Sequence, residues 1–215
     1  MKIAPEGKSF ILTSGVGVAF ALWLSVFTGK RFAFWLLGIT SLWLVIVLQF
    51  FRDPARFPPD REDIILAPAD GRVISILPSD LSPLEPKGKR VSIFMSPFNV
   101  HVNRSPVKGT VKQVEHFNGN FLTASKIEAE RENERTMTLV DTTYGEVAFC
   151  QIAGFLARRI VLYPRPGDNV FPGERIGLIK FGSRMDVYFP DDAQILVQMG
   201  QHVKAGETIL GEFSS

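Results

Sequence analysis

The sequence predicts a mainly β domain, a compact β-sandwich or barrel, preceded by a helical membrane hairpin. Three observations lead to this prediction. Two long apolar runs stand near the N-terminus, at residues 10–27 and 32–51. From residue 64 onward, short runs rich in β-branched side chains alternate with Gly, Pro and Asp, which is typical of strands joined by turns. Two turn-containing sequences also recur within the chain, and such recurrence indicates repeated hairpins.

The two apolar runs predict an antiparallel pair of transmembrane helices, residues 1–51. Neither run contains a charged residue, and only residues 28–31 separate them. A run of about 18 to 20 apolar residues is long enough to cross the bilayer core as a helix. The alternative is a cleaved signal peptide, because lysines precede the first run and an A-x-A sequence lies within it. The second run, directly behind the first, favours the hairpin.

Basic residues beside the two runs predict that both ends of the hairpin face the cytoplasm. Two lysines precede the first run and Arg52, Arg56 and Arg61 follow the second, whereas the turn contains only Lys30 and Arg31. We therefore expect a protein of the cell (inner) membrane with its large domain on the cytoplasmic side.

A proline-containing linker, residues 52–63, then leads into the β-rich domain, residues 64–215. Its predicted strands include residues 73–77, 91–95 and 136–140. The stretch at 124–135, ASKIEAERENER, is the one helix candidate in this domain. Its charge density is compatible with a solvated face, a loop or a ligand site.

Composition excludes several classes of function. The formal net charge of +2 gives no field that would attract nucleic acid. The single cysteine, Cys150, excludes an internal disulfide and a multi-cysteine zinc site, and its strand-like surroundings predict a small buried hydrophobe. The three histidines are scattered without metal-ligand spacing, so no metal is expected.

Two internal repeats frame the C-terminal part of the chain. The pattern G-x-x-V-x-x-G-E-x-I occurs at residues 167–176 and again at 200–209, and P-x-x-G-x-V occurs at 68–73 and 106–111. Gly182-Ser183 lies between the two copies of the longer pattern, where a strand would be held on both sides. A peptide bond fixed in this way is either positioned for chemistry or simply part of the core.

Three residues are candidates for a nucleophilic site: Asp70, His101 and Ser183. An acid, a base and a hydroxyl are the groups that nucleophile activation requires. The alternative interpretation makes Asp70 a turn-former, as Asp often is, and His101 a hydrogen-bonded histidine of the core.

Four motifs occur in order: Ala67-Pro68-Ala69-Asp70-Gly71, Ser96-Pro97-Phe98-Asn99-Val100-His101, Asn133-Glu134-Arg135 and Phe181-Gly182-Ser183-Arg184. Together they resemble the phosphatidylserine decarboxylase family, and most closely its short bacterial and archaeal branch. The resemblance runs from about residue 50 to the C-terminus.

This resemblance implies a self-processing proenzyme with a pyruvoyl (pyruvate) group. Ser183 would attack the Gly182 carbonyl, and the chain would split into a β chain, residues 1–182, and an α chain, residues 183–215. Both would remain together as a heterodimer, with further oligomerisation possible. The pyruvoyl group derived from Ser183 would be the electron sink for decarboxylation, without a metal. Phosphatidylserine of the membrane, or an ether-lipid (archaetidylserine) counterpart, would lose CO₂ to give the ethanolamine lipid.

The resemblance also assigns roles to individual residues. Asp70 and His101 fall on family positions linked to processing or catalysis. Long-chain relatives have a second histidine where this chain has Arg104. The base for self-cleavage is therefore open: His101 serves both steps, or Asp70 acts more directly. Arg104, Asn133 and Arg135 are candidates for binding the headgroup.

A function of another class stays open beside the enzyme. The longer repeats also look like biotinyl/lipoyl-type units, which would make the protein a membrane-anchored carrier or adaptor without catalysis. A carrier needs a modifiable lysine at an exposed hairpin tip, but Lys180, the one lysine between the repeats, lies in the apolar run 176–181. That placement favours the enzyme. A third hypothesis, a pyruvoyl enzyme acting on another amino acid, is disfavoured by the membrane hairpin.

Overall fold

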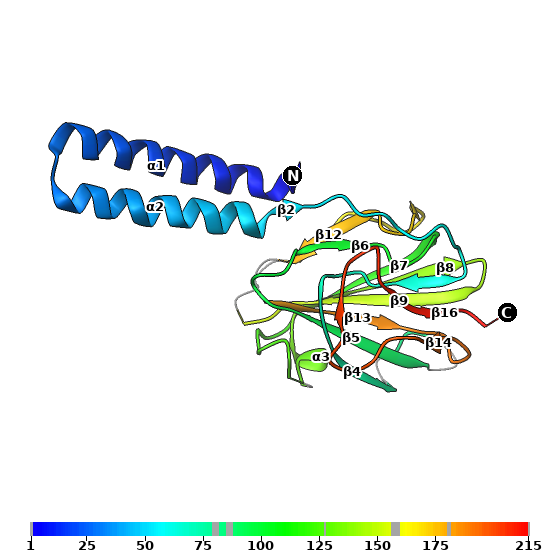
Figure 1. Ribbon diagram of the computed structural model, residues 1–215. Helices are drawn as coiled ribbons and strands as arrows, with labels where there is room; N and C mark the ends of the chain where they lie inside the picture. Colours follow the sequence, from blue (N-terminus) through cyan, green and yellow to red (C-terminus); the bar gives the residue numbers. More distant parts are fainter. Residues whose placement is uncertain are drawn as a thin grey trace. The chain divides into compact units, whose positions relative to one another are not determined.

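The computed structural model describes most of the chain, namely residues 2–78, 82–84, 88–126, 128–155, 160–179 and 182–214. The chain divides into two compact units, Met1–Ala55 and Arg56–Ser215. The first is helical and the second is built mainly of strands, as Figure 1 shows.

The N-terminal unit is a helical hairpin. Helix α1 (Lys8–Thr28) follows a 3-10 turn (Pro5–Gly7) and precedes helix α2 (Arg31–Phe50), and both are long and apolar enough to cross a membrane. The short strands β1 (Lys2–Ile3) and β2 (Arg52–Asp53) pair antiparallel at the open end. The two predicted helices are thereby confirmed.

The two helices meet through small side chains and expose large ones. Ala21 and Ala33 are completely buried, whereas Trp35 is 75% exposed. Small residues let two helix backbones approach closely, and exposed aromatic side chains suit a lipid environment. The turn is shorter than predicted, because α1 extends to Thr28 and α2 begins at Arg31. Gly29, with a φ of 59°, caps α1 in the left-handed region.

The second unit is mainly β, as predicted. Its described residues form one short helix, α3 (Ala129–Glu132), and the following strands: β3 (Ile64–Leu66), β4 (Gly71–Pro78), β5 (Lys89–Met95), β6 (Val102–Arg104), β7 (Gly109–Phe117), β8 (Arg135–Thr142), β9 (Gly145–Ile152), β10 (Ile160–Leu162), β11 (Asn169–Val170), β12 (Arg175–Ile179), β13 (Ser183–Tyr188), β14 (Gln194–Ile195), β15 (His202–Val203) and β16 (Ile209–Glu212).

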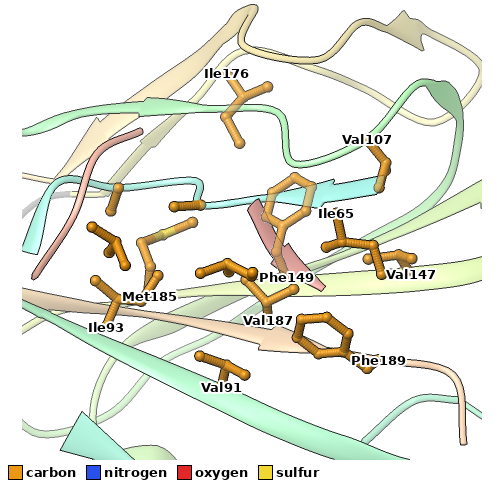
Figure 2. Close-up of a cluster of buried hydrophobic side chains, with 14 of the residues drawn as sticks. Ile65, Val91, Ile93, Val107, Val147, Phe149, Ile176, Met185, Val187 and Phe189 are labelled. Atoms are coloured by element: carbon orange, nitrogen blue, oxygen red, sulfur yellow. The ribbon is translucent and has the colours of Figure 1, made fainter. Parts of the chain in front are cut away.

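One large antiparallel sheet dominates this unit, in the order β11-β7-β8-β9-β13-β5-β4-β15. Two smaller sheets, β10-β12-β6 and β14-β16-β3, complete the fold. The large sheet curls as a half-barrel, and Figure 2 shows Phe149, Met185 and Val187 from its inner face beside Ile65 and Ile176 from the small sheets. Strand β13 lies near the middle of the large sheet, between β9 and β5.

The internal repeats are also structural repeats. Gly167 and Gly173 have φ values of 93° and 73°, and the equivalent Gly200 and Gly206 have 86° and 72°. Left-handed values of this kind are accessible to glycine at little cost. Each repeat contributes a two-residue strand, β11 or β15, that pairs with one copy of the shorter repeat, in β7 or β4 respectively. This arrangement does not confirm the predicted biotinyl/lipoyl likeness.

The charged stretch 124–135 is mostly not helical. Of its residues that the structure describes, only Ala129–Glu132 form a helix, and β8 begins at Arg135. Arg131 and Glu132 are exposed, but Glu130 is 7% exposed and Asn133 is completely buried. The interpretation of this stretch as a solvent-exposed face is therefore wrong for Glu130 and Asn133, whose buried partners are described below.

Candidate active site

Ser183 is the first residue of β13 and is completely buried. It pairs with Met95 of β5, while its neighbour Arg184 pairs with Ile152 of β9, so the start of β13 is held on both sides. Gly182 precedes it with a φ of +60°. The Gly182–Ser183 peptide therefore joins a left-handed turn to a strand that the sheet fixes from both sides.

The Ser183 hydroxyl donates a hydrogen bond to the Met95 thioether, with an Oγ–Sδ distance of 3.3 Å. The same sulfur accepts a long contact of 3.7 Å from Nδ2 of Asn103, whose Oδ1 accepts a hydrogen bond of 2.9 Å from Gln151. A thioether is a weak acceptor. It orients the hydroxyl but does not remove its proton, so activation of Ser183 requires a base elsewhere.

His101 is completely buried in the segment that joins β5 to β6. Its Nδ1 lies 3.0 Å from the carbonyl oxygen of Asn99. Because a carbonyl only accepts, this contact assigns the proton to Nδ1 and makes Nε2 the basic nitrogen of a neutral ring. The geometry suits both interpretations of His101, a hydrogen-bonded core histidine and a general base.

Asp70 lies in the turn before β4. Its carboxylate accepts two hydrogen bonds from Nη2 of Arg56, at 2.8 and 2.6 Å, and one of 2.8 Å from the backbone N–H of Ala205. These contacts join Asp70 to the C-terminal repeat, whereas the hydroxyl of Ser183 contacts Met95. Asp70 and Ser183 thus form hydrogen bonds with different residues. That Asp70, His101 and Ser183 act together in one nucleophilic site stays a prediction.

The two arginines predicted to bind the headgroup have backbone partners. Nη1 of Arg104, which is 9% exposed, donates to the carbonyl of Gly173 over 2.8 Å. Nη1 of Arg135 donates to the carbonyl of Arg131 over 2.8 Å, and its guanidinium lies 4.3 Å above the ring of Phe117. Neither contact tests headgroup binding.

Asn133 uses its side-chain amide to hold two chain segments together. Its Nδ2 donates to the carbonyls of Leu122 and Ala153, over 2.8 and 2.7 Å, and its Oδ1 accepts from the Leu122 N–H over 2.9 Å. Both amide hydrogens are therefore engaged by the protein itself. The geometry supports a positioning role for Asn133 more directly than the predicted contact with a headgroup.

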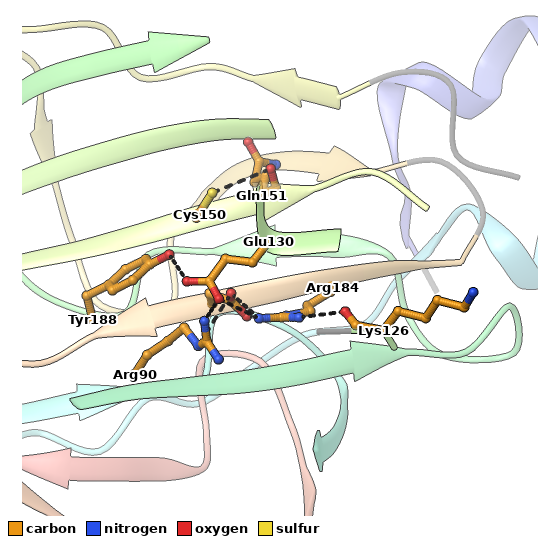
Figure 3. A network of polar contacts seen from close by, with 8 residues as sticks. Arg90, Lys126, Glu130, Cys150, Gln151, Arg184 and Tyr188 are labelled. Carbon is orange, nitrogen blue, oxygen red and sulfur yellow. Dashed lines mark hydrogen bonds and ion pairs between the residues drawn. The ribbon is translucent and has the colours of Figure 1, made fainter. Parts of the chain in front are cut away.

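A buried ionic network surrounds Arg184, the residue after Ser183 (Figure 3). Arg184 binds Asp186 through two hydrogen bonds of 2.6 Å, and Arg90 contacts both Asp186 and Glu130. Tyr188 completes it, since its hydroxyl lies 3.4 Å from Glu130. Two arginines thus balance two carboxylates, as buried charges require. Desolvation by burial is the main cause that raises the pKa of the Tyr188 phenol.

The sequence-based prediction missed this network, although it had a visible signal. Arg184, Asp186 and Tyr188 alternate along β13, so they share one face of the strand. Polar residues at every second position of a buried strand indicate partners across the sheet.

Cys150 is completely buried in β9, as predicted, and burial raises the pKa of its thiol well above the ordinary value. A thiol in this environment is unreactive. Within the described ranges, no group of three or more His, Cys, Asp or Glu side chains is placed to hold a metal ion.

The chain is similar to a family model and to many curated proteins. The model of the family described as phosphatidylserine decarboxylase matches residues 43–211. A curated phosphatidylserine decarboxylase proenzyme of Chlorobium chlorochromatii (strain CaD3) is 47% identical over 179 residues, which cover 83% of this chain and 84% of that protein.

Proposed function

Because this chain belongs to the phosphatidylserine decarboxylase family, we propose that it converts phosphatidylserine to phosphatidylethanolamine and CO₂ after cleaving itself. The family is one of carboxy-lyases, and the relative at 47% identity is named a proenzyme, which implies processing. The observation that carries the proposal is Ser183 itself. Its peptide bond to Gly182 lies at the start of β13, held by β5 and β9.

Self-cleavage begins with an N-to-O acyl shift. The Ser183 Oγ attacks the Gly182 carbonyl carbon, the C–N bond breaks, and the freed amine takes a proton, which leaves an ester. Loss of the Ser183 α-proton then expels the Gly182 carboxylate and produces a dehydroalanine. Its imine tautomer takes up one water and releases one ammonia, so that a pyruvoyl group caps the α chain.

The residues around Ser183 fit such a group. The sheet holds the backbone that follows it, and the Gly182 carbonyl packs against Gly154, where a Cβ would lie only 2.0 Å from the oxygen. The pyruvoyl ketone supplies the electron sink that decarboxylation of an amino acid requires. The chain's own contribution is to fix its position, to bury it and to deliver protons.

His101 is the candidate for proton delivery. With its proton on Nδ1, toward the Asn99 carbonyl, Nε2 is the ring nitrogen that would accept a proton during elimination and return one to the decarboxylated carbon. Both carboxylate oxygens of Asp70 already accept hydrogen bonds from Arg56, which favours His101 over Asp70 as the direct base.

The two product chains are expected to stay associated without a covalent link. After cleavage, β13 of the α chain keeps its pairings with β5 and β9 of the β chain, and β15 and β16 keep theirs with β4 and β3. Buried ion pairs from Arg184 and Asp186 to Glu130 and Arg90 also cross between the chains. These contacts support the predicted heterodimer.

The membrane hairpin gives a testable topology. We expect residues 1–51 to keep the protein in the bilayer through a carbonate wash, with the β-rich unit in the cytoplasm. A Thr28→Cys variant should react with an impermeant maleimide on intact cells. The parent protein is the matched control, because Cys150 is buried and its pKa is raised. Labelling of Thr28→Cys only from the cytoplasmic face would contradict the predicted topology, in which the turn of the hairpin faces the outside.

The substrate prediction concerns the lipid. A membrane-anchored site meets a phospholipid headgroup at high local concentration, so affinity for the free amino acid is unnecessary. We expect carboxyl-labelled phosphatidylserine in detergent micelles to release labelled CO₂, and free serine to release little or none. Equal rates on the two substrates would show that the site recognises the amino acid and not the lipid.

A further inference from the structure

We propose that Gly154 is a positioning residue for self-cleavage, because its missing side chain makes room for the carbonyl group that Ser183 attacks. The inference rests on the proposed function and adds a residue that the sequence motifs do not contain. Gly154 follows β9 directly, and Gly182 directly precedes β13.

The contact between the two glycines is very close. A Cβ on Gly154 would lie 2.0 Å from the Gly182 oxygen and 3.1 Å from the carbonyl carbon. The register explains this proximity: Arg184 pairs with Ile152 in the antiparallel ladder, and extending the pairing by two residues brings Gly182 opposite Gly154. The carbonyl of the bond to be broken therefore rests against the Cα of Gly154.

Gly154 and Gly182 require glycine for different reasons. The φ of Gly182 is +60°, yet a Cβ there would meet no atom within 4 Å. Gly154 lies outside the left-handed range, so its backbone would suit any residue and only the space is lacking. The backbone conformation of Gly182 sets the direction of the scissile peptide. The missing side chain of Gly154 lets the neighbouring chain segment approach that peptide closely.

The backbone on the N-terminal side of Gly154 is held firmly. The Ala153 N–H donates to the Glu134 carbonyl over 2.9 Å, and the Ala153 carbonyl accepts from Asn133 over 2.7 Å. Asn133 is itself completely buried. A methyl group added at Gly154 would thus push against a fixed backbone on one side and the scissile carbonyl on the other.

The expected effect on cleavage follows from the displacement. A Cβ at 2.0 Å must move to beyond roughly 3 Å, so the carbonyl would shift by about 1 Å relative to the Ser183 hydroxyl, and a misplacement of that size lowers a rate by about 100-fold. The rate of chain splitting, followed by intact mass during synthesis in a cell-free system, should fall accordingly in Gly154→Ala.

Gly109→Ala is a matched control. A Cβ on Gly109 would lie 2.2 Å from the Asp141 oxygen, again a backbone carbonyl of an adjacent strand, and Gly109 is likewise outside the left-handed range. Both variants should lower the melting temperature to a similar extent. Gly109→Ala should still split at the parent rate, whereas a purely structural role for Gly154 would affect the two variants alike.

A second variant tests whether the crowding at this point slows splitting. The same Cβ on Gly154 would lie 3.2 Å from the Cβ of Ala124, so Ala124→Gly removes one of the close contacts of the added methyl group. The double variant Gly154→Ala/Ala124→Gly should recover part of the splitting rate.

The outcomes separate this inference from the proposed function. Slow splitting of folded Gly154→Ala with normal splitting of Gly109→Ala supports the role of Gly154. Splitting of Gly154→Ala at the control rate, or failure of both the single and the double variant to fold, overturns it. Absence of splitting in the parent chain would refute the proposed self-cleavage, and the inference with it.

Discussion

Replacing Ser183 with alanine is expected to leave one full-length chain that has no decarboxylase activity. The change removes the hydroxyl that attacks Gly182 and also the atoms from which the pyruvoyl group would form. The lost hydrogen bond to the Met95 sulfur is weak, and a neutral hydrogen bond is worth about 1 kcal/mol, so the fold should persist. Denaturing electrophoresis and CO₂ release on phosphatidylserine measure the two effects.

Ser92→Ala provides the matched control for that experiment. Ser92 is a completely buried serine of β5 that pairs with Asp186 of β13, so the change removes the same hydroxyl from the neighbouring strand. This variant should split and decarboxylate like the parent. If Ser183→Ala still splits between residues 182 and 183, Ser183 is not the nucleophile of self-cleavage.

Replacing His101 with alanine is expected to give a folded protein that loses processing, decarboxylation or both. General acid–base catalysis by a positioned side chain contributes typically 10²–10⁴-fold, so a loss of about that size should follow. Truncation of the buried ring should cost no more than about a few kcal/mol of stability. Thermal melting, chain splitting and CO₂ release measured on one preparation separate these effects.

His202→Ala is the control for His101. His202 is exposed in β15, so its removal should change neither splitting nor turnover. A His101→Ala variant that splits and turns over normally would return His101 to the role of a hydrogen-bonded core residue. A variant that splits normally but fails to decarboxylate would leave Asp70 as the candidate base for self-cleavage.

Features that depend on neighbours along the chain were predictable from the sequence. The apolar run at 10–27 lies within α1 and that at 32–51 within α2 except for its last residue, and the runs at 73–77 and 91–95 lie within β4 and β5. In each case, the side chains of consecutive residues determine the periodicity and the burial. The repeats were visible for the same reason, because a left-handed turn restricts residue choice locally.

Features that depend on distant partners were not predictable in this way. Glu130 belongs to a charged stretch, and only the fold brings it to Arg90 and Arg184. The pairing of Asp70 with Arg56 is equally invisible in the sequence, since Arg56 lies in what was predicted to be a linker. Lys180 and Phe181, which the carrier hypothesis and the cleavage motif involve, lie outside the described residues.

The site shows the same division. Gly182 and Ser183 were identified from motifs and repeats, because their roles depend on their own chemistry and backbone conformation. Gly154 went unnoticed, since its requirement for glycine comes from a carbonyl on another strand. Asn133 was identified but given a contact with the headgroup, whereas its amide holds the chain beside that glycine.

The intact mass of the purified parent protein tests self-cleavage most directly. We expect two chains, residues 1–182 with a free carboxyl group and residues 183–215 with a pyruvoyl cap, the latter blocked to N-terminal sequencing. Together they should differ from the precursor by one water gained and one ammonia lost. A single full-length chain in a preparation that decarboxylates phosphatidylserine would contradict the proposed mechanism.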